Sequence, residues 1–251
     1  MKAFIMLIVF VSFNQHSPIK INGDKASIAH VNTSQENLSH SEWTKLLQKH
    51  VNNKGLVNYI TFKKDKAALD SYLQMLSENE PKEKWSKHEI LAYYINLYNA
   101  ATVRLIVENL PINSIKDISR PWTKSRIQVG NDKLSLDDIE HRILRKMDEP
   151  RVHFALNCAS FSCPKLISEA YTATKLNKQL ERVTKEFINS SENNIAADFI
   201  KISSIFKWYR RDFKVNGKVD VIGFINQYSE VRIRPSAKIS YTSYDWGLNQ
   251  Q

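Results

Sequence analysis

Both cysteines of the chain lie in one short stretch, HFALNCASFSCP, which spans residues 153–164. Four residues separate Cys158 from Cys163, so a turn between them would bring their Cα atoms within bridging range. A cysteine acts as a catalytic nucleophile when a base takes its proton and a third group orients that base. Two neighbouring thiols can instead form a structural disulfide or exchange with other disulfides. The spacing leaves all three chemistries open.

Two histidines are candidate bases for the Cys158 thiol. His141 lies four residues after Asp137 and three after Asp138 on a predicted helix, so either carboxylate can hold its ring in one tautomer. His153 precedes Cys158 by five residues on a predicted strand. A regular strand would point the two side chains to opposite faces, which makes His141 the better placed base.

The remaining candidates are polar residues near the thiols. Asn157 lies beside Cys158, and the pair suggests a Cys–His–Asn arrangement. Cys163 precedes Pro164, and a helix beginning there would lower the pKa of its thiol. The candidate catalytic residues are Cys158, His141, His153, Glu140 and Asn157, the redox or disulfide pair is Cys158 and Cys163, and polar support comes from Asn96, Asn99 and Ser162.

Cofactor motifs are absent from the sequence. A metal site would need Glu140, His141, His153 and Cys158 to converge, and no HxH or CxxC spacing supports one. The six glycines form neither GxGxxG nor a P-loop, and GxSxG and HExxH do not occur. We therefore expect no metal and no other cofactor.

The elements that must position these residues are mostly helical. The strongest is residues 86–109, which begins with a capping box of Ser86 and Glu89 and is apolar around most of its circumference. It should be the central buried helix, and its Asn96 and Asn99 must find hydrogen-bond partners. Further helices are expected at about 43–51, 64–76, 135–147, 174–187, 205–213 and 221–229, and strands at 152–158, 199–203, 238–241 and in a hairpin turning at Gly130 and Asn131.

This pattern predicts a single α+β domain over residues 41–251, helix-rich, with a small sheet around the central helix. Before it, residues 1–20 read as a signal peptide because Lys2 is followed by 11 apolar residues, too few to span a bilayer. Residues 21–40 form a polar linker. We therefore expect export to the periplasm or the cell exterior, without stable membrane insertion after the signal is cleaved.

The net charge of +10 raises the question of an acidic partner. The basic residues are dispersed in small groups, and no nucleic-acid-binding motif accompanies them. Specific nucleic-acid recognition is therefore not expected, and the partner is an unidentified substrate or a component of the cell envelope.

Five stretches resemble the domain of unknown function 547 family, which occurs in exported bacterial proteins and in plant and animal proteins. They cover roughly residues 86–248 in the family's order. The resemblance implies a family-like core but little biochemistry, although some relatives join this module to glutaredoxin-like domains. The stretches are AYYINLYNAATVRLI, LSLDDIEHRILR, RVHFALNCASFSCPKL, SSIFKWYRRDF and YTSYDWGLN.

Three functions remain open. The first is a cysteine-dependent hydrolase or acyltransferase with Cys158 as nucleophile and a nearby histidine as base, which the polar residues around the predicted strand end favour. The second is a thiol–disulfide redox protein that uses Cys158 and Cys163. The third is a disulfide-stapled binding module of the envelope, with aromatic contacts from Trp208, Tyr209 and Trp246.

Overall fold

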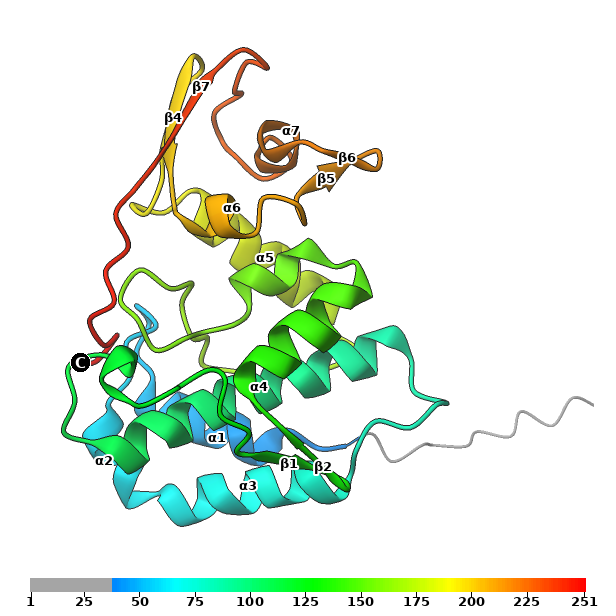
Figure 1. Cartoon of the computed structure of the whole chain (residues 1–251), viewed down its shortest axis with the longest axis vertical. Helices are drawn as coiled ribbons and strands as arrows, with labels where there is room; N and C mark the ends of the chain where they lie inside the picture. The colour runs from blue at the N-terminus through cyan, green and yellow to red at the C-terminus, as the bar shows by residue number, and fades with distance from the viewer. Residues whose placement is uncertain (1–37) are drawn as a thin grey trace, which may run out of the picture. The chain divides into compact units, whose positions relative to one another are not determined.

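Helix α4 (Lys87–Asn109) occupies the centre of the computed structural model, which describes residues 38–251 (Figure 1). Ser86 and Glu89 cap its first turn with reciprocal hydrogen bonds. Most side chains between Leu91 and Val107 are buried, as the all-round apolar pattern predicted. The predicted signal peptide and nearly all of the linker lie outside the described residues.

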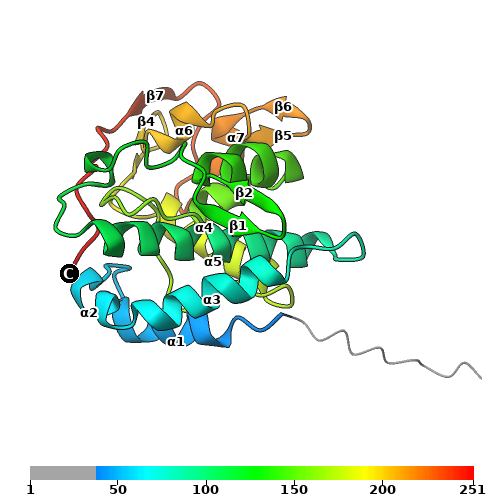
Figure 2. The same cartoon turned by 60° about the horizontal axis from the view of Figure 1, so that its bottom comes forward.

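Three helices join α4 in the larger of two hydrophobic cores. They are α1 (Ser41–His50), α2 (Tyr59–Lys64) and α3 (Lys66–Glu78). Two of them, α2 and α3, pack directly against α4, and the third, α1, packs on α2 and α3. The hairpin of β1 (Ile127–Val129) and β2 (Asp132–Leu134) covers α3, as Figure 2 shows. Its turn falls at Gly130, whose positive φ of 54° suits a tight hairpin, as the sequence predicted.

A second core lies between α5 (Leu176–Ile188) and the elements that follow it. Phenylalanines dominate this core, with Phe154, Phe206, Phe213 and Phe224 in mutual contact. The surrounding elements are β3 (Asn194–Ile195), β4 (Phe199–Ile202), α6 (Ile205–Trp208), β5 (Lys214–Val215), β6 (Lys218–Val219), α7 (Val221–Ile225) and β7 (Lys238–Tyr241). The described part of the chain is therefore one α+β domain with small sheets, as predicted.

The last residues of the chain connect the two cores. β7 pairs in parallel with β4, and the segment after it runs back toward the helical layer (Figure 1). There it forms isolated bridges to Ser160, Ser114 and Val57. This return places Tyr244 and Trp246 beside the loop that carries the cysteines.

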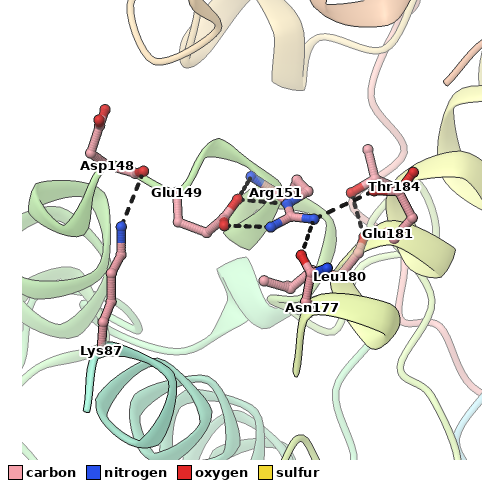
Figure 3. Close-up of polar contacts among 8 residues, drawn as sticks. All are labelled: Lys87, Asp148, Glu149, Arg151, Asn177, Leu180, Glu181 and Thr184. Carbon is pink, nitrogen blue, oxygen red and sulfur yellow. Dashed lines mark hydrogen bonds and ion pairs between the residues drawn. The ribbon is translucent and has the colours of Figure 1, made fainter. Parts of the chain in front are cut away.

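A series of irregular helical turns leads from the hairpin to the cysteines. After a short 3₁₀ turn η1 (Ile115–Asp117) earlier in the chain, these are the π-helix η2 (Asp138–Ile143) and the 3₁₀ turns η3 (Leu144–Met147) and η4 (Pro150–Phe154). Arg151 fixes η4 through a bidentate pair with Glu149 and a hydrogen bond to Asn177 on α5 (Figure 3).

Two predicted elements near the cysteines are wrong. Residues 152–158 form the end of η4 and a loop rather than a strand, and no helix begins at Pro164. The apolar alternation arises because Phe154 enters the second core, whereas Val152 and Leu156 enter the first. A short turn between two cores therefore resembled a strand buried on both faces.

One helix of residues 38–251 is long and apolar enough to cross a membrane. This helix is α4, and 78% of its most apolar 18-residue window is buried inside the protein. Its length and composition follow from its position in the core.

Candidate functional site

Two asparagines on α4 hold the loops around the cysteines. The Asn99 side chain donates to the Ala155 carbonyl and accepts from the Asn157 amide, both at 2.9 Å. Asn96 makes the same pair of contacts with the backbone of Tyr171. Both amides are fully buried, so each satisfies a backbone donor and acceptor that no regular structure pairs.

Asn157 and Ser162 shape the thiol loop from within. The Asn157 amide donates to the Pro164 carbonyl at 2.8 Å, and its oxygen accepts from the Ala159 amide. The Ser162 hydroxyl accepts from the backbone of Asp245. Asn157 contacts no histidine among residues 38–251, so it closes the loop instead of orienting a base.

The loop brings the two thiols together. The Sγ atoms of Cys158 and Cys163 lie 3.2 Å apart, and both cysteines are free and partly exposed. The Cys158 backbone amide also donates to Cys163 Sγ at 3.0 Å. The separation is that of a hydrogen bond between thiols, so the disulfide, one of the three alternatives that the spacing left open, is not formed here.

The surroundings of the two sulfur atoms differ. Hydrogen bonds with the Cys163 thiol, the Ser160 hydroxyl at 3.1 Å and the Tyr244 hydroxyl at 3.5 Å lower the pKa of Cys158 to about 7, against the effect of burial. Burial and the neighbouring Cys158 charge raise the pKa of Cys163 well above its usual value. Cys158 is therefore the thiol of the pair that ionises first, and Cys163 keeps its proton to higher pH.

Both cysteines open onto a cleft of about 400 Å³. Its walls come from α4, η2, the thiol loop, α6 and the C-terminal return. Aromatic side chains dominate them, namely Tyr98, Trp122, Trp208, Tyr209, Tyr244 and Trp246.

His141 lies in this cleft, held as predicted by Asp137, whose Oδ1 is 3.2 Å from Nε2. Its Nδ1 lies 3.0 Å from an Arg145 guanidinium nitrogen, which can only donate. Nε2 must therefore carry the ring proton and donate to Asp137. Both nitrogens are occupied, so His141 has no free acceptor for a thiol proton.

His153 also lines the cleft and is paired with a residue that the sequence did not indicate. Its Nε2 lies 2.9 Å from Asp212 Oδ2, and its ring stacks on Tyr209 at 4.0 Å between centroids. Burial alone would raise the pKa of Asp212, but hydrogen bonds from His153 and Arg145 outweigh it and hold that pKa well below its usual range. His153 therefore has a fixed ring and one nitrogen, Nδ1, outside this pair.

Glu140 is buried in the cleft wall with tyrosine partners. The Tyr98 hydroxyl donates to Glu140 Oε2 at 3.3 Å. Burial and the Glu140 carboxylate together raise the pKa of Tyr209 far above its usual value. Glu140 contacts no histidine within residues 38–251, so it contributes a negative charge to the cleft and does not orient a base.

Sequence reasoning missed two residues, Ser160 and Tyr244, whose hydroxyls contact Cys158. Among residues 38–251, no histidine nitrogen is hydrogen-bonded to either sulfur; the hydroxyls of Ser160 and Tyr244 are, and they bond each other at 2.9 Å. Ser160 was recognisable from its place between the cysteines. Tyr244 lies 86 residues from Cys158 in the chain, and only the parallel pairing of β7 brings it near.

No group of three or more His, Cys, Asp or Glu side chains within residues 38–251 is arranged to hold a metal ion.

The comparison with protein families gives one match: the model described as "Protein of unknown function, DUF547" covers residues 82–188. This segment includes α4, η2, η4 and both cysteines. No curated protein and no solved structure matches the chain.

Proposed function

Because the chain belongs to the DUF547 family, whose description names no activity, we propose its function from the geometry of the cleft: thiol–disulfide exchange by Cys158 and Cys163. The observation that carries this proposal is the 3.2 Å contact between a thiolate-forming Cys158 and a protonated Cys163. A nucleophilic thiolate next to a second thiol is the arrangement that such exchange requires.

The reaction proceeds in two displacements. The Cys158 thiolate attacks one sulfur of a substrate disulfide, the substrate S–S bond breaks, and the leaving thiolate takes a proton. Cys163 then loses its proton, and its sulfur attacks Cys158 Sγ to form the Cys158–Cys163 disulfide. The second substrate thiol leaves with the Cys163 proton. The substrate gains two electrons, and two equivalents of an external thiol, which are oxidised to their disulfide, restore the dithiol form.

The hydroxyls of Ser160 and Tyr244 give the two cysteines different roles. They stabilise negative charge on Cys158 without removing a proton from it, so no histidine base is needed. Cys163 remains protonated until the mixed disulfide exists, because the Cys158 thiolate beside it opposes its ionisation.

The pairing of His153 with Asp212 favours a second candidate, cysteine-dependent acyl transfer. His153 lines the same cleft as Cys158, and a histidine fixed by a carboxylate is the base–orienter pair of cysteine hydrolases. In that case His153 Nδ1 takes the proton of the Cys158 thiol, Cys158 Sγ bonds to a carbonyl carbon of the substrate, and Nδ1 returns the proton to the group that leaves this carbon. This candidate retains Cys158 as nucleophile but replaces His141 by His153 as the base.

An aromatic disulfide reagent that releases a coloured thiolate tests the first candidate. The reduced protein should release one equivalent rapidly and a second as Cys163 resolves the mixed disulfide. Cys163→Ala should release only the first and retain the reagent on Cys158, as seen by mass spectrometry. Cys158→Ala should lose the rapid phase. A wild-type protein that also stops at a stable mixed disulfide would exclude exchange between the pair.

A panel of activated esters and thioesters tests the second candidate. A burst of acylated Cys158 that disappears in His153→Ala, with Cys163→Ala still active, would favour acyl transfer over exchange. The absence of any acylation would remove it.

We also propose that the protein works after export, in an oxidising compartment where such exchange has substrates. The apolar run after Lys2 supports this proposal. Sequencing the N-terminus of the protein from its native source tests it, because export by a cleaved signal predicts a start between residues 12 and 20 or shortly after.

A further inference from the structure

The cleft differs in charge from the rest of the chain. The sequence carries a net charge of +10, yet within residues 38–251 no lysine or arginine lines the cleft, whereas Asp137 and Glu140 do. The two imidazoles in the wall are already paired with carboxylates, His141 with Asp137 and His153 with Asp212. The nearest basic side chain behind the wall, Arg145, is neutralised by the same Asp212.

The aromatic rings around the thiols form one connected group. Trp208 stacks on Trp246 at 5.8 Å and 26°, and Tyr244 contacts both rings at 4.9 and 4.6 Å. Trp208 remains 48% exposed, so part of this aromatic surface is open to a ligand. Ring faces attract cations through their quadrupole, and tryptophan does so most strongly.

Two of the protein's own cations already lie over rings of this wall. The Lys116 ammonium lies 4.1 Å from the Trp246 ring centroid, and the Arg145 guanidinium carbon lies 5.2 Å from that of Tyr209. Inside the cleft, the same kind of aromatic surface meets two carboxylates and the Cys158 thiolate, and no side-chain ammonium or guanidinium there is available to balance them.

We infer that the cleft selects substrates that carry an ammonium or guanidinium group next to the bond that Cys158 attacks. The aromatic rings and the carboxylates of Asp137 and Glu140 bind this group, and its position directs the reacting atom to Cys158. The inference rests on the proposed role of Cys158 as nucleophile. It concerns substrate class and applies equally to disulfide exchange and to acyl transfer.

A pair of methanethiosulfonate reagents of opposite charge tests this selectivity. One carries a trimethylammonium-ethyl group and the other a sulfonate-ethyl group, and both transfer that group to a thiolate with methanesulfinate as the leaving group. Cys163→Ala is the parent protein, because it prevents resolution of the product. Each rate is divided by the rate of the same reagent with free cysteine.

The cationic reagent should modify Cys158 about 10-fold or more faster than the anionic one after this correction. The net charge of the whole protein predicts the opposite preference, so the sign of the ratio is decisive. Asp137→Asn combined with Glu140→Gln should bring the ratio close to that of free cysteine. Glu181→Gln removes a carboxylate on α5, outside the cleft, and should leave the ratio unchanged.

The possible failures are distinguishable. A ratio near one, or one that favours the anionic reagent, overturns the cation selectivity and leaves Cys158 as a nucleophile. Slow modification by both reagents, in the wild-type protein as well as in Cys163→Ala, overturns the nucleophile itself. If the double variant does not fold, Asp137→Asn alone, at a partly exposed side chain, must still lower the ratio measurably.

Discussion

Two arginine–carboxylate pairs lie near the start of η4, and they are chemically alike. In each pair, here called a fork, two arginine nitrogens donate to one carboxylate. Arg151 donates to Glu149 through Nε at 2.7 Å and Nη2 at 2.6 Å. Arg145 donates to Asp212 through Nε at 2.6 Å and Nη2 at 3.0 Å. All four side chains are mostly buried. Ion-pair geometry and burial alone do not distinguish a structural pair from a functional one.

The difference lies in the other contacts of each fork. In the Arg151–Glu149 pair, the remaining arginine nitrogen, Nη1, also contacts Asn177 and Glu181 on α5 (Figure 3). This fork therefore joins η4 to α5, and its outer end is exposed to solvent. In the second, Asp212 Oδ2 also contacts His153, and His153 lines the cleft with the thiols. Asp212 therefore fixes the orientation of an imidazole ring in the cleft wall, whereas Glu149, whose side chain pairs only with an arginine among residues 38–251, stabilises the fold.

Removal of either carboxylate should have the largest effect on stability. Asp212→Ala and Glu149→Ala should each lower the free energy of unfolding by about 3 kcal/mol, because each leaves a mostly buried arginine without its bidentate carboxylate. Denaturant titration measures this loss. Only Asp212→Ala should also abolish the hydrogen-bonded imidazole proton of His153 in NMR spectra. If the His153 imidazole proton were also lost in Glu149→Ala, the two forks would not be independent.

The two buried asparagines of α4 offer a second comparison of this kind, with a smaller expected loss of stability. Asn99→Ala and Asn96→Ala should each destabilise the protein by about 2 kcal/mol, because each leaves a buried amide and a carbonyl unpaired. Asn99 holds Ala155 and Asn157 next to Cys158, whereas Asn96 holds Tyr171. Alkylation of Cys158 should therefore slow in Asn99→Ala alone. Equal rates in the two variants would mean that the thiol loop keeps its shape without Asn99.

The sequence predicted the parts of this arrangement that depend on local pattern. The capped α4 helix, the hairpin turn at Gly130 and the pairing of His141 with Asp137 all connect residues a few positions apart. Asp212 lies 59 residues from His153, and no local pattern signals that contact. The strand prediction over residues 152–158 failed for the same reason, since two cores from distant segments take alternate side chains of that stretch.

The pH dependence of Cys158 alkylation should respond to changes in the cleft and not to changes in the Arg151 fork. The pKa of Cys158 is lowered to about 7, so its reaction with iodoacetamide should rise with pH and level off above neutrality as the thiolate forms. Tyr244→Phe removes one donor to the thiolate, so the midpoint should move up and the rate at pH 7 fall roughly twofold. Arg151→Lys should leave the midpoint in place. A profile with its midpoint near that of a free cysteine would contradict the assigned thiolate.

The smallest effect is expected at the exposed end of the Arg151 fork. Glu181 lies 3.4 Å from Arg151 Nη1, but its side chain is 56% exposed. Water competes for both charges there, so Glu181→Gln should change the free energy of unfolding by less than about 0.5 kcal/mol. Asn177→Ala provides the matched measurement, because Asn177 accepts from the same nitrogen at 2.9 Å. A loss in Glu181→Gln comparable to that in Glu149→Ala would mean that the fork depends on its outer partner and is as extended a network as the one at Asp212.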